Sequence, residues 1–305
     1  MGTKQGERLT IVTDPTRRTI ADAITWAGLE TTHLTTACVM APRNYNGEPP
    51  PPQIADAMHN SDVILIATQY SLTYAPATRE AVRNGARVAS MPGVTEGMMI
   101  NGGLRAAPSE LRPITHRLVE VLSKSKNYQI SSSNGTIIEV SRGSRAVRTD
   151  DGDLSKPGTI GNLPAGEAYI PVQEGIADGV IVIDRMGTII KEPLKISISK
   201  GRLVDAVGED RDAFMHIIDE AELAGDKNAR NLAEFGMGTN NKARYYDYIL
   251  EAEKFYGTVH FAFGNNLVIG GESDSKIHYD GIILKPKVTV EGEVILENGQ
   301  FMFKS

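Results

Sequence analysis

The feature of this sequence that most constrains its fold is the regular alternation of two periodicities over the first hundred residues. Short apolar runs such as "RLTIVTD" and "DVILIATQ" are typical of buried strands, whereas apolar residues recur at helical spacing in "TRRTIADAITWAGLE" and "APATREAVRNGA". Strands that alternate with helices are joined by crossover connections and therefore pair in parallel. We predict an α/β N-terminal domain with a small parallel sheet over residues 1–107.

The remainder of the chain, residues 108–305, has a different pattern. After one helical segment it is rich in strands, and Asn134-Gly135 lies between two alternating apolar runs, as in a tight hairpin. Only two further helical patterns interrupt the strands, at 209–225 and 242–256. Because consecutive strands joined by short turns pair antiparallel, we expect an α+β domain with a mostly antiparallel sheet.

Composition excludes several classes of function. The formal net charge is −6 and no Lys/Arg-rich run is flanked by aromatic residues, so we expect no nucleic-acid partner. No segment approaches the ~20 apolar residues of a membrane span, so we expect no membrane partner.

Cys38 is the only cysteine, which rules out a disulfide framework within the chain and favours a cytoplasmic location. Its apolar neighbours indicate a buried small side chain. The first domain lacks the glycine-rich phosphate-binding patterns, which argues against a nucleotide site.

The stretch "SKIHYDG" places two metal-binding residue types at strand spacing. Side chains alternate along a strand, so His278 and Asp280 emerge on one face and Tyr279 on the other. An imidazole and a carboxylate on one face can bind the same ion. A solvated face, or a hydrogen bond between the two side chains, would have the same spacing.

The segment "GTVHFAFG" has the same geometry around His260. Thr258 and Ala262 share the face of this histidine, and small neighbours leave room for an ion or a substrate. The alternative is a core histidine bonded to a carbonyl group. Four other histidines lack acidic partners at ligand spacing and are interpreted as structural: His33, His59, His116 and His216.

Two glutamates stand out by their sequence context. Glu167 leaves the turn of "NLPAGEAYIP" where a strand begins, so its carboxylate can point from a loop end into a site. Glu234 lies between apolar neighbours in "NLAEFGMGTN", and we expect Gly236 and Gly238 to break the element after it. A charge among apolar residues is costly unless it is paired or bound to a cation. The alternative for both is an exposed glutamate.

Taken together, these segments resemble peptidase family M29, the aminopeptidase T group of metallo-aminopeptidases. "NLPAGEAYIP", "LAEFGMGTN", "EAEKFYGTVHFAFG" and "IHYDG" follow the order of that family, and the likeness spans most of residues 108–300. The resemblance implies that the second domain is the metal-binding catalytic domain. It implies a metal ligand at each of five positions: Glu167, Glu234, His260, His278 and Asp280.

Five protein ligands suit two divalent ions, Zn²⁺, Co²⁺ or Mn²⁺, if a carboxylate bridges them. The resemblance thus implies a metallohydrolase that releases an N-terminal amino acid, or cleaves a related amide, in a small-molecule or peptide substrate. Glu174 and Glu253 are candidates for the general base, since neither is needed as a ligand. A homodimer is expected from the resemblance and from the size of the chain.

The sequence also departs from that family. "GNNLVIGG" follows His260 without the tyrosine ligand of the aminopeptidases, Gly166-Glu167 stands where they often carry paired glutamates, and the chain is shorter than they are. Two alternatives therefore stay open. One is a 2,5-dihydroxypyridine dioxygenase type of enzyme, in which one Fe(II) would be held by His260, His278 and Asp280. Against it, those relatives carry histidine at the Glu234 position and lack the one at His260. The other is a non-catalytic binding protein on the same scaffold.

Overall fold

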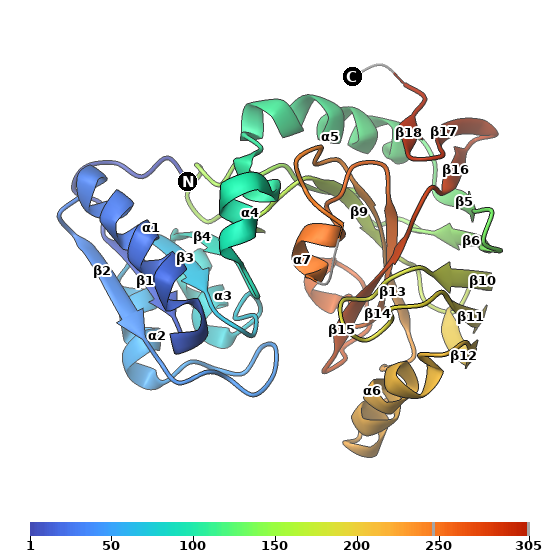
Figure 1. Ribbon diagram of the computed structural model, residues 1–305, viewed down its shortest axis with the longest axis horizontal. Helices are drawn as coiled ribbons and strands as arrows, with labels where there is room; N and C mark the ends of the chain where they lie inside the picture. The colour runs from blue at the N-terminus through green and yellow to red at the C-terminus, as the bar shows by residue number, and fades with distance from the viewer. Residues whose placement is uncertain (246–247, 304–305) are drawn as a thin grey trace. The chain divides into compact units, whose positions relative to one another are not determined.

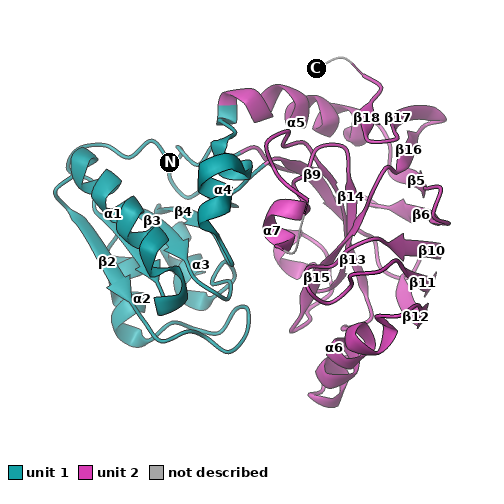
Figure 2. Ribbon diagram, in the orientation of Figure 1, with its two compact units in different colours: residues 1–108, 152–165 teal, residues 109–151, 166–305 magenta. Residues whose placement is uncertain are grey.

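The computed structural model describes residues 1–245 and 248–303. Its contacts divide the chain into two compact units, which Figure 2 shows in different colours. Unit 1 comprises Met1–Pro108 and Gly152–Ala165, and unit 2 comprises Ser109–Asp151 and Gly166–Ser305. The sequence predicts a single boundary at residue 108, whereas in the structure the chain also returns to unit 1 over 152–165.

Unit 1 is built on a five-stranded sheet in the order β2-β1-β3-β4-β8, in which every strand pair is parallel. Figure 1 labels its first four strands, β1 to β4. The strands are β1 (Leu9–Thr13), β2 (Thr35–Val39), β3 (Val63–Ala67), β4 (Arg87–Ser90) and β8 (Ile160–Asn162). The helices are α1 (Arg18–Thr31), α2 (Pro52–His59), α3 (Pro76–Arg83) and α4 (Glu96–Asn101), with 3-10 turns at Pro15–Arg17 and Gly103–Arg105. The predicted small parallel sheet is therefore present, and its fifth strand comes from outside the first 107 residues.

Helices cover both faces of this sheet. Ile54 and Met58 of α2 pack with the sheet residues Ile64 and Ile66 in one apolar cluster. Ile20 of α1 packs in a separate cluster with Met98 of α4. Strands that are buried on both faces are apolar throughout, which is why "VILIA" in β3 reads as a continuous apolar run.

Unit 2 contains two antiparallel sheets. The larger has the order β12-β11-β10-β6-β5-β16-β17-β18, and the smaller has the order β15-β14-β13-β9-β7. The strands of the larger sheet are β5 (Asn127–Ser131), β6 (Ile137–Ser141), β10 (Asp178–Ile183), β11 (Leu194–Ser199), β12 (Arg202–Val207), β16 (Lys287–Val290), β17 (Glu293–Glu297) and β18 (Gln300–Phe301). The strands of the smaller sheet are β7 (Arg148–Asp150), β9 (Glu167–Pro171), β13 (Leu232–Gly238), β14 (Val259–Gly264) and β15 (His278–Ile283). The helices are α5 (Pro108–Ser123), α6 (Arg211–Leu223) and α7 (Ile249–Ala252), with a 3-10 turn at Leu267–Ile269.

A single hydrophobic core joins the two sheets of unit 2. Phe235 of β13 and Phe261 of β14 lie in it with ring centroids 5.5 Å apart, and Ile181 of β10 joins them from the larger sheet. Leu118 of α5 and Phe214 of α6 belong to the same cluster. Because one face of the smaller sheet is committed to this core, polar side chains on its strands must emerge on the opposite face.

Several local predictions can be compared with these elements. The hairpin at Asn134-Gly135 is confirmed, since β5 and β6 pair antiparallel on either side of it. The helix predicted over 242–256 is wrong in extent: α7 covers only Ile249–Ala252, and residues 246 and 247 lie outside the described residues. Cys38 is partly buried and packs against the apolar cluster around α2. Among the described residues, no helix combines the length and apolarity needed to cross a membrane.

Candidate metal centre

Four adjacent strands of the smaller sheet carry the five predicted ligands on one face. The alternation of side chains turns Phe235 and Phe261 into the core and leaves Glu234 and His260 on the opposite face. On β15 the same alternation packs Tyr279 against the core. The five donors and their strands are Glu167 on β9, Glu234 on β13, His260 on β14, and His278 and Asp280 on β15. The predicted strand faces of "GTVHFAFG" and "IHYDG" are therefore confirmed.

Small residues face these ligands across the strands. Gly236 pairs with His260, and Gly238 pairs with Glu167. Ala262 pairs with Asp280. A Cβ on Gly236 would lie 2.0 Å from His260 Nε2, so only glycine admits the imidazole there. The element does end before Thr239, as expected, because Gly238 is the last residue of β13; Gly236, however, lies inside the strand, where it makes room for a neighbouring group.

Glu167, Glu234 and His260 form the tightest part of the cluster. Each offers one donor atom, and the three donor atoms lie within 4.8 Å of one another. His260 Nε2 is 3.3 Å from Glu167 Oε2 and 3.4 Å from Glu234 Oε1. All three residues are buried, so neither glutamate is the exposed residue of the alternative interpretation.

The second oxygen of Glu234 faces the other histidine. His278 Nε2 is 3.6 Å from Glu234 Oε2 and 3.5 Å from Asp280 Oδ2. The two carboxylate oxygens of Glu234 thus face His260 and His278 separately, and two three-residue donor sets share this glutamate.

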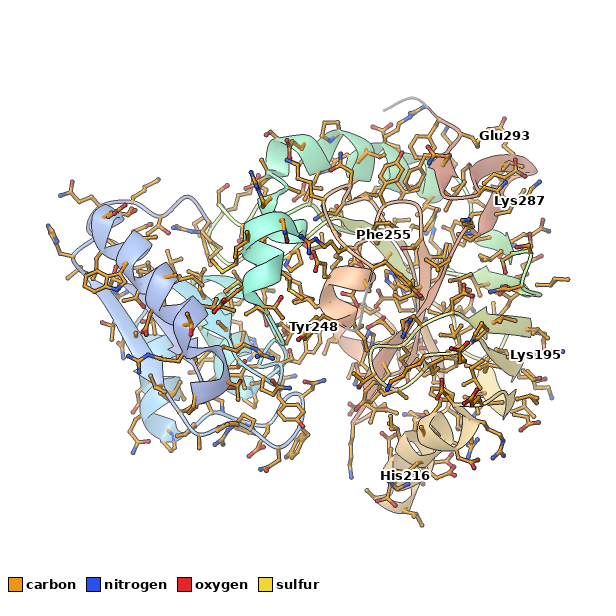
Figure 3. The ribbon with its side chains drawn as sticks, in the orientation of Figure 1. Lys195, His216, Tyr248, Phe255, Lys287 and Glu293 are labelled. Atoms are coloured by element: carbon orange, nitrogen blue, oxygen red, sulfur yellow. The ribbon has the colours of Figure 1, made fainter. Side chains whose placement is uncertain are left out.

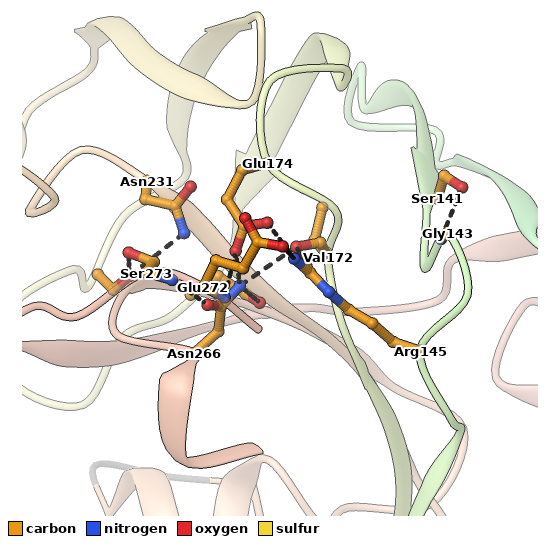
Figure 4. A network of polar contacts seen from close by, with 11 residues as sticks. Ser141, Gly143, Arg145, Val172, Glu174, Asn231, Asn266, Glu272 and Ser273 are labelled. Atoms are coloured by element: carbon orange, nitrogen blue, oxygen red, sulfur yellow. Dashed lines mark hydrogen bonds and ion pairs between the residues drawn. The ribbon is translucent and has the colours of Figure 1, made fainter. Parts of the chain in front are cut away.

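The surrounding loop fixes the orientation of His278. Its Nδ1 lies 2.7 Å from the carbonyl oxygen of Asn265, so Nδ1–H donates there and Nε2 is turned toward the carboxylates. The neighbouring Asn266 is fully buried, and its amide donates to the carbonyls of Val172 and Ala233 and to Glu174 Oε1 (Figure 4). These bonds anchor the loop that presents the Asn265 carbonyl.

Sequence patterns did not reveal two further charged groups at the cluster. Lys254 is fully buried, and its Nζ donates to Glu167 Oε1 and lies 2.7 Å from Glu253 Oε1. Asp150 Oδ2 is 3.9 Å from the same Nζ. In the sequence "EAEKFYG" nothing distinguishes Lys254 from an exposed lysine on a helix. It reaches the cluster because α7 ends at Ala252, two residues before it.

Burial and charge determine the ionisation of these groups when no ion is bound. Burial acts to lower the pKa of His260, but the hydrogen bond to Glu234 and the charge of Glu167 raise it to about 9. Burial also acts to lower the pKa of His278, and the charges of Asp280 and Glu234 raise it to about 10. Burial raises the pKa of Glu234. Each histidine must therefore release a proton before it binds an ion.

The two candidate general bases lie in different surroundings. Glu253 is buried beside Lys254, and burial raises its pKa to about 8 although the lysine acts in the opposite direction. Glu174 belongs to the network around Asn266 and is also paired with Arg145 (Figure 4). Of the histidines interpreted as structural, His216 lies exposed on α6 (Figure 3).

The donor set suits a divalent transition-metal ion. Three carboxylates and two imidazoles are ligands that Zn²⁺, Mn²⁺, Co²⁺ and Fe²⁺ accept. Glu167 Oε2 is buried and has no hydrogen-bond partner among the described residues, and once the nearby His260 releases its proton, this oxygen is costly to bury unless a metal cation meets it. These protein groups therefore fit a metal ion on this face of the sheet.

Comparisons with known proteins agree with this fold. The solved structure of 2,5-dihydroxypyridine dioxygenase from Pseudomonas putida matches with a TM-score of 0.78 and 16% identity, covering 97% of this chain and 92% of that chain. AmpT from Thermus thermophilus matches with a TM-score of 0.72 and 15% identity, covering 99% and 95%. The predicted resemblance to both groups is thereby confirmed, and at these identities it establishes the fold.

Sequence comparison identifies the family. The 2,5-dihydroxypyridine 5,6-dioxygenase of Pseudomonas putida is 23% identical over an alignment of 176 residues, which covers 52% of this chain and 49% of that protein. The match thus spans about half the length of this curated relative. The profile of the family described as 2,5-dihydroxypyridine 5,6-dioxygenase (NicX) matches residues 2–303. By this nearly complete match, the chain belongs to the NicX family of enzymes.

Proposed function

We propose that this protein is a metal-dependent hydrolase that uses two divalent ions, Zn²⁺, Co²⁺ or Mn²⁺, to cleave an N-terminal amino acid or a related amide from a small-molecule or peptide substrate. The observation that carries the proposal is the position of Glu234, whose two oxygens face His260 and His278 separately. A carboxylate placed in this way can bridge two ions, which a mononuclear site does not require.

Each ion has its own set of protein donors under this proposal. Glu167, Glu234 and His260 would hold the first ion, and Glu234, His278 and Asp280 would hold the second. The cluster holds five carboxylates, those of Asp150, Glu167, Glu234, Glu253 and Asp280, and one ammonium group, that of Lys254, which contacts Asp150, Glu167 and Glu253. With all six groups ionised and both histidines neutral, the net charge of the cluster is −4. Two divalent ions balance the four negative charges that remain, whereas one leaves half of them uncompensated.

Bound ions of this kind supply a water molecule of lowered pKa and polarise the scissile carbonyl group. The protein must supply the general base, and Glu253 is the better of the two candidates. Its pKa of about 8 lets it accept and release a proton near neutral pH. Both oxygens of Glu174 are already engaged, by Arg145, Asn266 and the Glu272 amide.

A second candidate function is favoured by the family match. An Fe(II) ring-cleaving dioxygenase needs two histidines and one carboxylate with open coordination positions, and His260, His278 and Asp280 contain that set. In this case Glu167 and Glu234 would serve as neighbouring charged groups rather than as ligands.

Metal analysis combined with two assays separates these functions. Protein purified without a nickel column is expected to bind about two divalent ions per chain and, with Zn²⁺, Co²⁺ or Mn²⁺, to release the chromophore from aminoacyl-anilides. One tightly bound iron with oxygen uptake on 2,5-dihydroxypyridine would establish the dioxygenase instead. A chain that binds no metal would leave only a binding protein.

The assembly and location of the protein are part of the same proposal. We expect a homodimer in the cytoplasm, as the resemblance to the aminopeptidases and the single cysteine indicate. Light scattering coupled to size-exclusion chromatography measures the mass of the assembly, and a monomer would contradict the expectation.

A further inference from the structure

Lys254 is a buried cation beside the proposed metal ligands that the proposed reaction does not use. Its side chain is 1% exposed, and a buried ammonium group is costly unless it is paired and hydrogen-bonded. Its three carboxylate neighbours are Glu167, Glu253 and Asp150. The lysine is therefore expected to influence the position of the acidic groups around it.

The lysine divides the two oxygens of Glu167 between different partners. Oε1 accepts a hydrogen bond from Lys254 Nζ. Oε2 lies 3.3 Å from His260 Nε2 and has no hydrogen-bond partner among the described residues. As long as Lys254 occupies Oε1, only Oε2 is available to an ion.

The main chain holds Lys254 in this place. The backbone carbonyl of Lys254 accepts a hydrogen bond from the backbone N–H of Asn240 at 2.9 Å. A Cβ on Gly238 would lie 2.7 Å from the Lys254 carbonyl carbon, so the segment is pressed directly against β13. Gly238 is the cross-strand partner of Glu167, so the backbone itself brings the lysine to this carboxylate.

We propose that Lys254 is a positioning residue of the metal centre. It restricts Glu167 to binding an ion through one oxygen, and it holds Glu253 beside the ligands, where that carboxylate can act as the general base. The inference rests on the proposed metal centre and concerns how the centre is arranged. A lysine that only balanced charge would leave the coordination of the ion unchanged when it was replaced.

Cobalt substitution tests this role directly. The visible absorption of Co(II) weakens as its coordination number rises, so it reports whether Glu167 binds through one oxygen or two. In Lys254→Met we expect two bound Co(II) ions, weaker visible absorption than in the wild type, and a kcat at least about 10-fold lower with little change in KM. Lys254→Arg, which keeps a cationic donor, is expected to recover part of the absorption.

Three further variants serve as controls. Lys242→Met removes a surface lysine paired with Glu110 and is expected to leave the spectrum unchanged. Glu253→Gln leaves the bond from Lys254 to Glu167 intact, so it should lower kcat without changing the absorption. If Lys254→Met does not fold, Lys254→Met combined with Glu253→Gln leaves fewer unpaired carboxylates, and the same weakening is expected.

The outcomes distinguish this inference from the proposed function. Two bound ions with unchanged Co(II) absorption in a folded Lys254→Met protein would overturn the positioning role and leave the hydrolase proposal standing. A wild-type chain that binds no divalent ion would overturn the proposed function, and this inference with it.

Discussion

At the scale of single residues, Glu234 has the most specific arrangement in the cluster. Its carboxylate is buried, and its two oxygens face two different histidines. Glu167 and Asp280 each face only one of these histidines, so the loss of Glu234 affects both donor sets at once.

Replacing Glu234 is therefore expected to disrupt binding of both ions. Changes to outer groups around a metal commonly cost 10–100-fold, so we expect Glu234→Gln to lower metal affinity or turnover by at least about 100-fold. Competition with a chromogenic chelator measures the affinity, and Glu293→Gln, at an exposed position, is the matched control. Full metal content in Glu234→Gln would remove this residue from the ligands.

Gly236 makes a second prediction at the residue scale. A Cβ at this position would lie 2.0 Å from His260 Nε2, so either the imidazole or the strand must move. We expect Gly236→Ala to lower the free energy of unfolding by about 1–3 kcal/mol, as overpacked sites do, and to weaken metal binding. Gly97→Ala is the control, because its Cβ meets only Thr95 Oγ1 at 3.6 Å. Wild-type metal binding in Gly236→Ala would contradict the close contact.

The five proposed ligands could be nominated from sequence, whereas the charged residues that surround them could not. His260, His278 and Asp280 follow from strand alternation combined with a familiar order of motifs. Lys254 and Asp150 come together only through tertiary packing. The local sequence around a lysine in a charged segment does not indicate such packing.

At the scale of elements, the strands followed their periodicity and the last helix did not. Apolar alternation identified β14 and β15 because one face of each packs on the core, whereas the segment that forms β13 was not predicted as a strand. The pattern over 242–256 is helical in spacing, yet of the residues described in this range only four, Ile249–Ala252, are helical. Burial of Glu251, Glu253 and Lys254 shows that tertiary contacts override local propensity there.

The hydrogen bonds of Glu174 to the loop that follows β14 predict how stability depends on pH. Burial acts to raise the pKa of Glu174, but hydrogen bonds from Arg145, the Glu272 amide and Asn266 bring it below its ordinary value of 4.5. A carboxyl group whose pKa is lower in the folded state contributes stability above its unfolded pKa, and this is lost as the pH falls through the folded value.

We therefore expect the difference in free energy of unfolding between the wild type and Glu174→Gln to be largest above pH 5 and to shrink as the pH falls below about 4.5. Urea unfolding at a series of pH values measures it. Glu209→Gln, at an exposed position, is the control. A difference that grows toward low pH would contradict the assigned ion pair.

At the scale of the whole molecule, all five proposed ligands belong to one unit. Glu167 is the first of them in sequence, and it follows Gly166, where unit 2 resumes. Unit 1 contributes none of these five donors. Binding of an ion is therefore a stabilisation of unit 2.

Metal binding is expected to stabilise the chain unevenly. A ligand at 100 times its Kd stabilises the state that binds it by about 2.7 kcal/mol. Hydrogen exchange with and without Zn²⁺ is expected to slow in β9, β13, β14 and β15, and EDTA should reverse the effect. The amides of β1 and β3 serve as the internal control, and equal slowing there would place the ion elsewhere.

The sequence indicates two parts of different architecture, but it does not indicate that the chain returns to unit 1 over residues 152–165. A change from alternating helices and strands to consecutive strands indicates two architectures. β8 has three residues, and nothing in "TIGN" separates it from the strand-rich segments around it. Its place beside β4 depends on a long-range parallel pairing, which local patterns do not encode.

The return of the chain to unit 1 also affects how the protein can fold during synthesis. Until Asn162 has left the ribosome, β4 is an unprotected sheet edge of the kind that recruits foreign strands. By then β5, β6 and β7 of unit 2 have already emerged. The sheet of unit 1 therefore cannot be completed before the first strands of unit 2 have been synthesised. Domains usually fold one after another from the N-terminus, but here the folding of the two units must overlap in time.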